Sequence, residues 1–372
     1  MSVNSGYAKP VVRDEWAMCR SLPAHEGSAC HIALGQPSFA SKNGFGDYMR
    51  HLFDAFERAS AASPPLRFLD VALRGIGQVM FQDNPLTGLL FLAAILIGAF
   101  SAGAPLIALA GILAVLVGTA TALVLGVDRA AWRAGLYGFN AVLTGLALAT
   151  FLEPGAMLVA FVVLAAAFSV VVTLAMQRLL EPYGLPALTF PFVLTSWLFL
   201  LASHGFAGVA GLSSGSLVAP AVLVASGPMH PIEFIGGVFR GISQVFLKDS
   251  AVAALLFLAG LAVSSWMAAA LAVAGAVIAV ALAHVFGAES DLVTGGLLGF
   301  SPVLTAVALG CTFSKPSAAV LAYAAFGTVV TVIIQVALNA ALTPFALPAL
   351  TMPFVLASWL FLLPKCAPGR EG

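Results

Sequence analysis

Residues 185–201 read LPALTFPFVLTSWLFLL, and residues 347–363 read LPALTMPFVLASWLFLL. Only two of these 17 positions differ, although 162 residues separate the two copies. Chance does not account for a match of this length within one chain, so the block indicates an internal repeat. A duplicated unit of this kind organises the whole fold.

Two shorter pairs of blocks extend the repeat toward the N-terminus. RGIGQV at 74–79 matches RGISQV at 240–245, and GFNAVLT at 138–144 resembles GFSPVLT at 299–305. Their offsets of 166 and 161 residues are close to that of the long block, and all three pairs keep the same order. The chain therefore consists largely of a tandem duplication.

The composition excludes an ordinary soluble domain. Of the 372 residues, 61% are hydrophobic and only 9% are charged, whereas a soluble domain carries about 25% charged residues. The formal net charge is zero, so no basic surplus exists for binding a nucleic acid. The four cysteines form no CxxC or Cys/His cluster, so neither a disulfide framework nor a metal site is indicated.

Charged residues are concentrated at the start of the chain. Residues 1–74 contain 15 of the 32 charges. Long uncharged windows follow, at 84–127, 134–152, 154–177, 182–232, 250–288 and 316–364. About 20 apolar residues span a bilayer as a helix, and backbone polar groups cannot face lipid unpaired. The windows therefore predict an all-α integral membrane protein.

Each half of the duplication contains five expected transmembrane helices, which makes ten in all. In the first half they lie near 88–101, 105–126, 134–151, 155–180 and 186–203. In the second half they lie near 250–266, 268–286, 294–312, 317–340 and 348–364. Because five is odd, the second copy must enter the membrane upside down. This is the inverted-repeat architecture of many transporters, in which the solute site lies between the repeats near the midplane.

The loop charges predict the orientation. With a cytoplasmic N-terminus, the inside loops contain Arg129, Arg133, Arg178 and Lys315, and the outside loops contain no Lys or Arg. This pattern fits the positive-inside rule. We therefore expect a multi-pass protein of the cell membrane, the inner membrane in a Gram-negative source, with both termini cytoplasmic. The expected divisions are a polar tail at 1–60, membrane repeats at 61–203 and 233–365, an extracytoplasmic linker at 204–232 and a C-terminal tail at 366–372.

Each half opens with a segment that is too short and too polar to span the bilayer. These segments, at about 68–83 and 233–249, contain Gly, Gln and Asp among apolar residues. We expect each to dip into the membrane and return, which requires protein or a cavity to cover its backbone. A helix lying flat at the interface is the alternative. Within the tail, residues 48–58 fit either a short amphipathic surface helix or part of a mobile segment.

Symmetric breaks in the third and fifth helices of each half indicate a pore lining. Pro186 and Pro191, with their counterparts Pro348 and Pro353, lie in the fifth helices. Proline frees a backbone carbonyl, and freed carbonyls can coordinate a solute. A kink needed only for packing is the alternative reading of each proline. Glycines, one asparagine and one proline interrupt the third helices. They are Gly135, Gly138 and Asn140 in the first half, and Gly295, Gly296, Gly299 and Pro302 in the second.

The polar residues beside the breaks are neutral, namely Gln78, Gln244, Thr189 and Thr351. Intramembrane charge marks proton relays and ion pathways, and the uncharged windows contain none. The expected cargo is therefore small, polar and uncharged. A planar solute would slide between flat apolar walls, for which Phe81, Phe139 and Phe300 are candidates. No catalytic dyad, phosphate loop or nucleophile elbow is evident, so the sequence indicates neither an enzyme nor a cofactor.

These blocks together resemble the urea transporters. The repeated LPALTxPF block looks like their signature, and so do GIGQVMFQDNPLTG at 75–88 and GFNAVL at 138–143. The resemblance covers about 66–365. In the second half KDSAVA at 248–253 replaces the NPxTG run, which departs from the family pattern.

The resemblance implies a passive, channel-like urea pore in each protomer of a homotrimer. Its filter would run between the repeats. Backbone carbonyls and the hydroxyls of Thr189 and Thr351 would form a row of hydrogen-bonding oxygen atoms on each of two opposite sides. Gln78 and Gln244 would help to hold urea at the mouths. The flat slot would be lined by Phe81, Phe139, Leu143, Phe300, Leu304 and Leu247. A channel for another small neutral solute, such as a short amide, ammonia or water, is the alternative, and a membrane enzyme or sensor is a more distant one.

Overall fold

The computed structural model describes Arg58, Ser60, residues 63–206, Gly208, Gly211, and residues 229–288 and 290–366. These described residues form 14 α-helices, α2 to α15, and short 3₁₀ and π segments. The chain is therefore all-helical there, apart from one isolated bridge between Leu152 and Gly211. Almost all of the predicted tail at 1–60, most of the linker and the residues after Cys366 lie outside the described residues.

Seven α-helices form the first half and seven form the second. The first half comprises α2 (Pro64–Gln78), α3 (Pro85–Ser101), α4 (Pro105–Val124), α5 (Arg129–Arg133), α6 (Phe139–Phe151), α7 (Ala156–Leu180) and α8 (Phe190–Ser203), with η2 (Glu181–Tyr183) before α8. The second half comprises α9 (Pro231–Ser243), α10 (Ala251–Ser264), α11 (Trp266–Val285), α12 (Ser290–Thr294), α13 (Phe300–Val307), α14 (Ala318–Leu342) and α15 (Met352–Cys366). Its short segments are η3 (Gln244–Phe246), η4 (Ala308–Thr312) and η5 (Thr343–Phe345).

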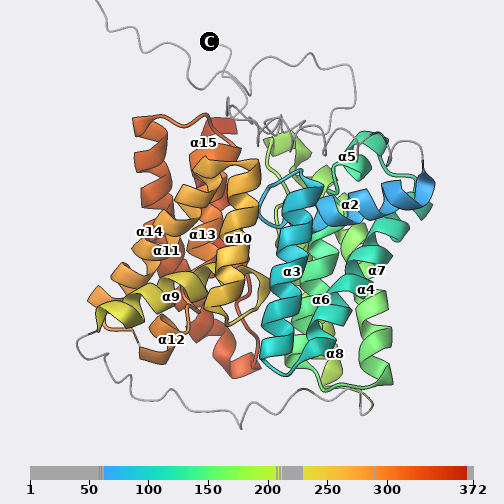
Figure 1. Cartoon of the computed structure of the whole chain (residues 1–372), viewed down its shortest axis with the longest axis horizontal. Coiled ribbons are helices and arrows are strands. Elements are labelled where there is room, and N and C mark those ends of the chain that lie inside the picture. Colours follow the sequence, from blue (N-terminus) through green and yellow to red (C-terminus); the bar gives the residue numbers. More distant parts are fainter. Residues whose placement is uncertain are drawn as a thin grey trace, which may run out of the picture.

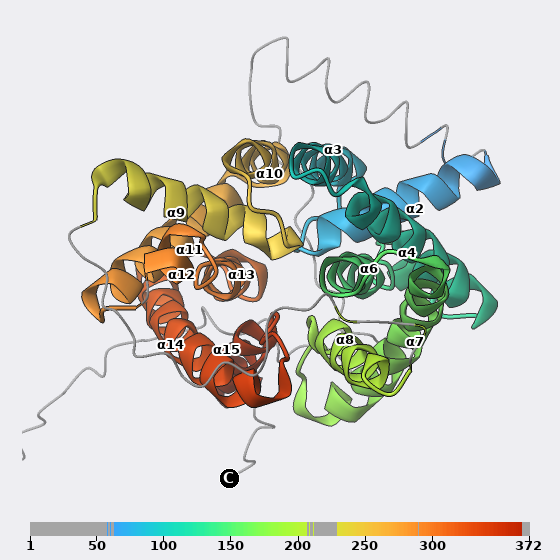
Figure 2. The ribbon, with the colours of Figure 1, turned by 90° about the horizontal axis from the view of Figure 1, so that it is seen from below.

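Matching elements of the two halves lie toward opposite ends of the molecule. Figure 1 shows α5 at the upper end and its counterpart α12 at the lower end, while α2 and α9 run crosswise at different heights. Figure 2 looks along the helices and shows the halves side by side, with α6 and α13 facing each other near the centre. The α8 and α15 helices are neighbours on one side of this centre, and α3 and α10 on the other.

The apolar helices differ in length. Four of them are long and apolar enough to cross a membrane: α4, α7 with η2, α11, and α14 with η5. The α9–η3 segment and α10 together form a pair that bends by 70° and also passes this test. Five shorter apolar helices are α3, α6, α8, α13 with η4, and α15. Long helices expose large apolar side chains, for example Leu164 on α7 and Ile333 on α14, as contact with lipid requires.

Side-chain caps and prolines set where several of these helices begin. The Asn84 side chain accepts hydrogen bonds from the backbone N–H groups of Leu86 and Thr87, and Pro85 occupies the first helical position of α3. Asparagine satisfies N–H groups that have no partner within the helix, and proline has no N–H to satisfy. Ser250 caps α10 in the same way by accepting from the N–H of Ala253.

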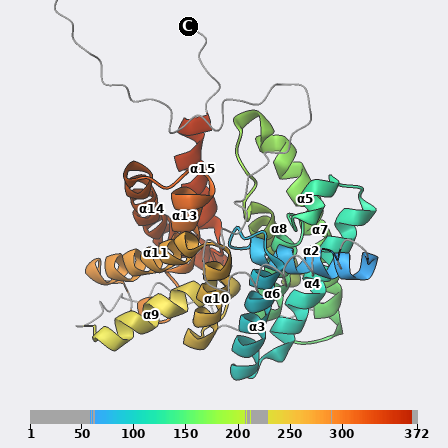
Figure 3. The same cartoon turned by 45° about the horizontal axis from the view of Figure 1, so that its top comes forward.

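The largest apolar core contains residues from both halves. Where α3 meets α10, the rings of Phe91, Phe246 and Phe257 form a fully buried cluster, with Phe246 and Phe257 stacked at 4.6 Å between centroids. Nearby, the Thr87 hydroxyl donates to the carbonyl of Gly260 at 2.8 Å. Figures 2 and 3 show α3 and α10 side by side. The halves are thus joined by a packed seam at this edge.

The third and fifth helices of each half begin later than the sequence predicted. A short extra helix, α5 or α12, and a turn precede α6 and α13, so these begin at Phe139 and Phe300. Pro186 and Pro348 were expected inside the fifth helices but lie before α8 and α15, which begin at Phe190 and Met352. The reason is the backbone two residues after each proline, where φ becomes positive and excludes a continuous right-handed helix.

Candidate functional site

Two threonine hydroxyls meet where the halves face each other. The Oγ1 atoms of Thr189 and Thr351 are 2.7 Å apart and share a hydrogen bond, although the residues are 162 positions apart in the chain. Thr189 directly precedes α8, at its N-cap position but without a side-chain capping hydrogen bond, and Thr351 directly precedes α15. Both residues are buried. The two helix N-termini therefore converge on one pair of hydroxyl groups.

The backbone before each threonine adopts a conformation that is rare outside glycine. Leu188 has φ of 52° and Leu350 has φ of 49°. A branched residue in this region is strained, and such strain persists only where the surrounding structure enforces it. The carbonyl of Leu188 accepts from the Asn140 amide at 3.4 Å, and that of Leu350 accepts from the Ser301 hydroxyl at 3.5 Å. The third helix of each half thus helps to hold the turn before the fifth.

Reciprocal tryptophan hydrogen bonds fix the two fifth helices to one another. The indole N–H of Trp197 on α8 donates to the carbonyl of Pro348 at 2.8 Å. Its counterpart Trp359 on α15 donates to the carbonyl of Pro186 at 2.9 Å. Each indole thereby reaches the proline turn that precedes the opposite helix. These two bonds brace the Thr189–Thr351 contact from both sides.

The two glutamines lie at the inner ends of α2 and α9. The Gln78 amide nitrogen donates to the carbonyl of Ala134 at 2.8 Å, and that of Gln244 donates to the carbonyl of Gly295 at 3.3 Å. Each bond ties the end of a crosswise helix to the turn before the third helix. One N–H of each amide is thereby used within the protein, and the amide oxygens are the atoms suited to accept from a solute N–H.

Two glycines allow this close approach of the crosswise helices. Gly135 and Gly296 have φ of 76° and 70°, and each carries the turn before the third helix past α2 or α9. A Cβ on Gly135 would lie 2.4 Å from the backbone nitrogen of Gly75, and one on Gly296 would lie 2.3 Å from that of Gly241. Neither the φ angle nor the space accommodates a side chain there.

Phe81 crosses from the first half to the second. It lies in the non-helical link between α2 and α3, with φ of 63°. Its ring makes edge-on contacts with Phe313 and Phe354, at centroid distances of 5.9 and 6.0 Å. Phe354 is one turn into α15 from Thr351. Leu247, the counterpart of Phe81 in the second half, has a similar φ of 56° and packs against the same large core.

The remaining predicted slot residues lie on α6 and α13. Phe139 and Phe300 are the first residues of these helices, and both are partly buried against the shared core. Leu143 and Leu304 follow one turn later and are fully buried in that core. Positions four apart share one helix face. The structure therefore brings each phenylalanine together with its leucine on one face of a central helix.

The arrangement offers hydrogen bonding without charge. A hydroxyl pair that shares one hydrogen bond still presents oxygen lone pairs and one further O–H. The positive ends of α8 and α15 both point toward it, which disfavours a cation at this point. Within the described part of the chain, no group of three or more His, Cys, Asp or Glu residues is placed to hold a metal ion. The chemistry on offer is hydrogen bonding to a polar molecule.

Asn140 has a larger role than its sequence position suggested. Its amide nitrogen also donates to the Thr173 hydroxyl at 3.3 Å, and its amide oxygen accepts from the backbone N–H of Phe192 at 3.2 Å. One side chain therefore links α6, α7 and the start of α8. The sequence signals were its polar side chain in the third helix and its place in a duplicated block, where the second copy has Ser301. Sequence reasoning gave no sign of the two tryptophan bonds.

Comparisons with known proteins identify the family of the chain. Residues 69–366 match the sequence profile of a family described as urea transporter. The chain is similar to urea transporter 1 of Ovis aries, with 29% identity over 304 residues, which cover 80% of this chain and 77% of that protein. It is also similar to urea transporter 1 of Rattus norvegicus, with 29% identity over 301 residues and the same coverage.

Proposed function

Because the chain belongs to the urea transporter family, whose members are transporters and not enzymes, we propose that it carries urea passively across a membrane through a channel between its two halves. The observation that carries this proposal is the meeting of Thr189 and Thr351 at 2.7 Å. This contact joins the repeats between the starts of α8 and α15, on the elements that the duplicated signature block forms. A solute that passes between the halves has to exchange hydrogen bonds with this pair.

The polar groups suit the chemistry of urea. Urea is planar and neutral, with N–H donors along its edges and one carbonyl acceptor. An unpaired amide-type group costs roughly 1–3 kcal/mol when it leaves water. The hydroxyls of Thr189 and Thr351 and nearby backbone carbonyls would replace the lost water contacts. Phe81, Phe139, Phe300, Leu143, Leu304 and Leu247 would form the flat walls, and Gln78 and Gln244 would offer amide oxygens at the mouths.

The proposal includes the architecture around the channel. We infer ten spans, formed by the four long helices, α10 and the five shorter apolar helices, arranged as inverted repeats at 61–203 and 233–365. The opposite placement of α5 and α12 supports this inversion. In this arrangement α2 and α9 are re-entrant, the linker at 204–232 is extracytoplasmic, and both termini are cytoplasmic. A homotrimer in the cell membrane, the inner membrane in a Gram-negative source, completes the proposal.

Replacing one central hydroxyl tests the channel. Thr351→Val keeps the side-chain volume but removes a hydrogen-bonding group, which is worth about 1 kcal/mol or roughly fivefold in rate. We expect urea permeability of proteoliposomes, measured by stopped-flow light scattering at matched protein content, to fall by about this factor. Thr121→Val on α4, whose hydroxyl bonds only the carbonyl of Val117 in its own helix, is the control. Unchanged flux in Thr351→Val would refute the role of the pair.

The alternative is a channel for another small neutral solute. Urea, formamide, ammonia and water all lack charge, and each would meet the same oxygen atoms. Permeabilities for these solutes and for methylammonium, measured in the same proteoliposomes, separate the possibilities. Urea flux no greater than that of empty liposomes would rule out the proposed cargo. A flux confined to water or ammonia would instead support the alternative.

A further inference from the structure

We propose that Arg74 is a positioning residue that sets the size selectivity of the channel by holding Phe81 in place; this inference rests on the proposed function. Arg74 lies on α2. Its effect would pass through the link between α2 and α3, residues 79–84, which carries Phe81. We call residues 79–84 the first link and residues 247–250, between η3 and α10, the second link.

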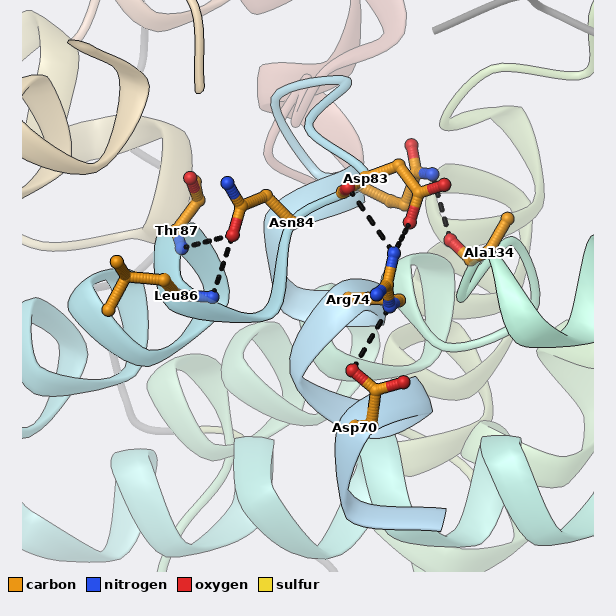
Figure 4. Close-up of polar contacts among 8 residues, drawn as sticks. Asp70, Arg74, Asp83, Asn84, Leu86, Thr87 and Ala134 are labelled. Atoms are coloured by element: carbon orange, nitrogen blue, oxygen red, sulfur yellow. Dashed lines mark hydrogen bonds and ion pairs between the residues drawn. The ribbon is translucent and has the colours of Figure 1, made fainter. Parts of the chain in front are cut away.

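Arg74 forms two ion pairs from a largely buried position. Its Nε donates to Asp70 Oδ1 at 3.1 Å, and its Nη1 donates to Asp83 Oδ1 at 2.7 Å. The same Nη1 also approaches the backbone carbonyl of Asp83 at 3.4 Å. The side chains of Arg74 and Asp70 are only 12% and 10% exposed, so solvent screens these pairs less than it screens surface pairs. Figure 4 shows the guanidinium between the two carboxylates.

The first link is fastened at both ends as well as by Arg74. At its start, Gln78 is bonded to the carbonyl of Ala134, and at its end the Asn84 side chain caps α3. Asp83 lies only two residues after Phe81, so the ion pair fixes the backbone directly beside it. Phe81 has φ of 63°, a strained conformation that needs such support. Between these two end anchors, the Arg74 side chain holds the link from α2 through Asp83, and within the link the Gln82 amide nitrogen donates to the carbonyl of Met80 at 2.8 Å.

The position of the Phe81 ring matters because of what it touches. Its edge-on contacts with Phe313 and Phe354 cross from the first half to the second. Phe354 follows Thr351 by three residues on α15, so the ring lies beside the start of the helix that presents one central hydroxyl. If the first link moves, the ring moves with it. The space left for a solute would then widen or change shape.

The second link has only an exposed counterpart of this clamp, which provides a matched control. Arg240, the counterpart of Arg74, pairs with Asp249 at 3.1 Å, but the two side chains are 43% and 63% exposed. The counterpart of Asp70 is Gly236, and the counterpart of Phe81 is Leu247. An exposed ion pair contributes little. Loss of Arg240 should therefore disturb the second link much less than loss of Arg74 disturbs the first.

The test compares solute selectivity in full-length protein in liposomes. We expect Arg74→Gln to lower the ratio of urea to N,N′-dimethylurea permeability by about threefold or more, since a pocket discriminates a methyl group by roughly tenfold or more when its walls are fixed. Arg240→Gln should leave the ratio within about 1.5-fold of wild type. Asp83→Asn, which keeps the Arg74–Asp70 pair, should lower the permeability ratio less than Arg74→Gln does. It replaces Arg74→Gln in the test if the Arg74→Gln protein does not fold.

A double-mutant cycle separates positioning from general weakening of the protein. Phe81→Ala should lower the same ratio, and adding Arg74→Gln to it should change little more, because coupled residues are not additive. A wild-type ratio in both Arg74→Gln and Asp83→Asn, or fully additive effects in the cycle, would overturn the inference. A wild-type protein that carries no urea would instead overturn the proposed function, so the two failures are distinguishable.

Discussion

The first and second links began as copies of one segment but now hold their backbones by different means. Phe81 and Leu247 keep nearly the same positive φ, and Asn84 and Ser250 both cap the helix that follows. Around this shared backbone the side chains have diverged. The first link is held by a largely buried arginine between two aspartates, whereas the second has an exposed ion pair. Duplication thus preserved the backbone geometry, the helix cap and an Arg–Asp pair, but not the burial of that pair or the second aspartate.

A second divergence lies at the helix end that each link faces. Gly77 on α2 corresponds to Ser243 on α9. In the first half the carbonyl of Gln82 approaches so closely that a Cβ on Gly77 would lie 2.6 Å from it. In the second half the Ser243 hydroxyl donates to the carbonyl of Lys248 at 2.5 Å and occupies the equivalent gap. The first link therefore requires a residue without a side chain at position 77. The second link requires the Ser243 side chain, which bridges the gap between α9 and the link.

The largest effect is expected from Gly77→Ala. The added Cβ would meet backbone atoms of Gln82, which cannot turn aside as a side chain could, and overpacking of this kind costs about 1–3 kcal/mol or more. Thermal unfolding in detergent, followed by size-exclusion chromatography, should show a Tm several degrees lower. Gly236→Ala on α9 is the control, because nothing lies within 4 Å of its Cβ position. An equal loss in both variants would contradict the comparison.

A smaller loss is expected from Ser243→Ala. Its hydroxyl donates to the carbonyl of Lys248 and accepts from the N–H of Ser250. Leaving the Lys248 carbonyl and the Ser250 N–H without the Ser243 hydroxyl costs about 1–3 kcal/mol. The same thermal assay should show a lower Tm, while Ser101→Ala at the exposed end of α3, whose hydroxyl bonds Gly98, should change little. A Tm equal to wild type for Ser243→Ala would show that the bridge does not stabilise the second link.

The smallest effect, and one of opposite sign, is expected from Lys248→Met. Lys248 corresponds to the neutral Gln82, is only 4% exposed, and takes part in none of the ion pairs found among the described residues. Its alkyl chain packs against Gly98 of α3. Removing an uncompensated buried charge favours the folded state by about 1 kcal/mol. The Tm should rise slightly, and it should stay the same in Lys315→Met, on an exposed loop. A lower Tm for Lys248→Met would indicate an unrecognised partner.

The order of apolar helices could be predicted from the sequence because each depends on its own residues. Uncharged windows gave ten apolar helices whose positions agree with those observed, apart from the starts of the third and fifth helices. Those starts were wrong because they depend on turns with positive φ at Gly135, Gly296, Leu188 and Leu350. Glycine hints at such a turn, but leucine gives no hint, since it adopts this backbone only when tertiary contacts enforce it.

The candidate site divides in the same way. The sequence alone determined the duplication, the neutrality of the polar residues and the identity of Thr189 and Thr351 as counterparts, because all of these are properties of residue order. Only the tertiary structure decided that these hydroxyls meet at 2.7 Å. It also decided that each tryptophan donates to a proline carbonyl in the other half, and that Arg74 forms an ion pair with Asp83. Contacts between distant segments arise from the packing of whole helices, and such packing leaves no local periodicity in the chain.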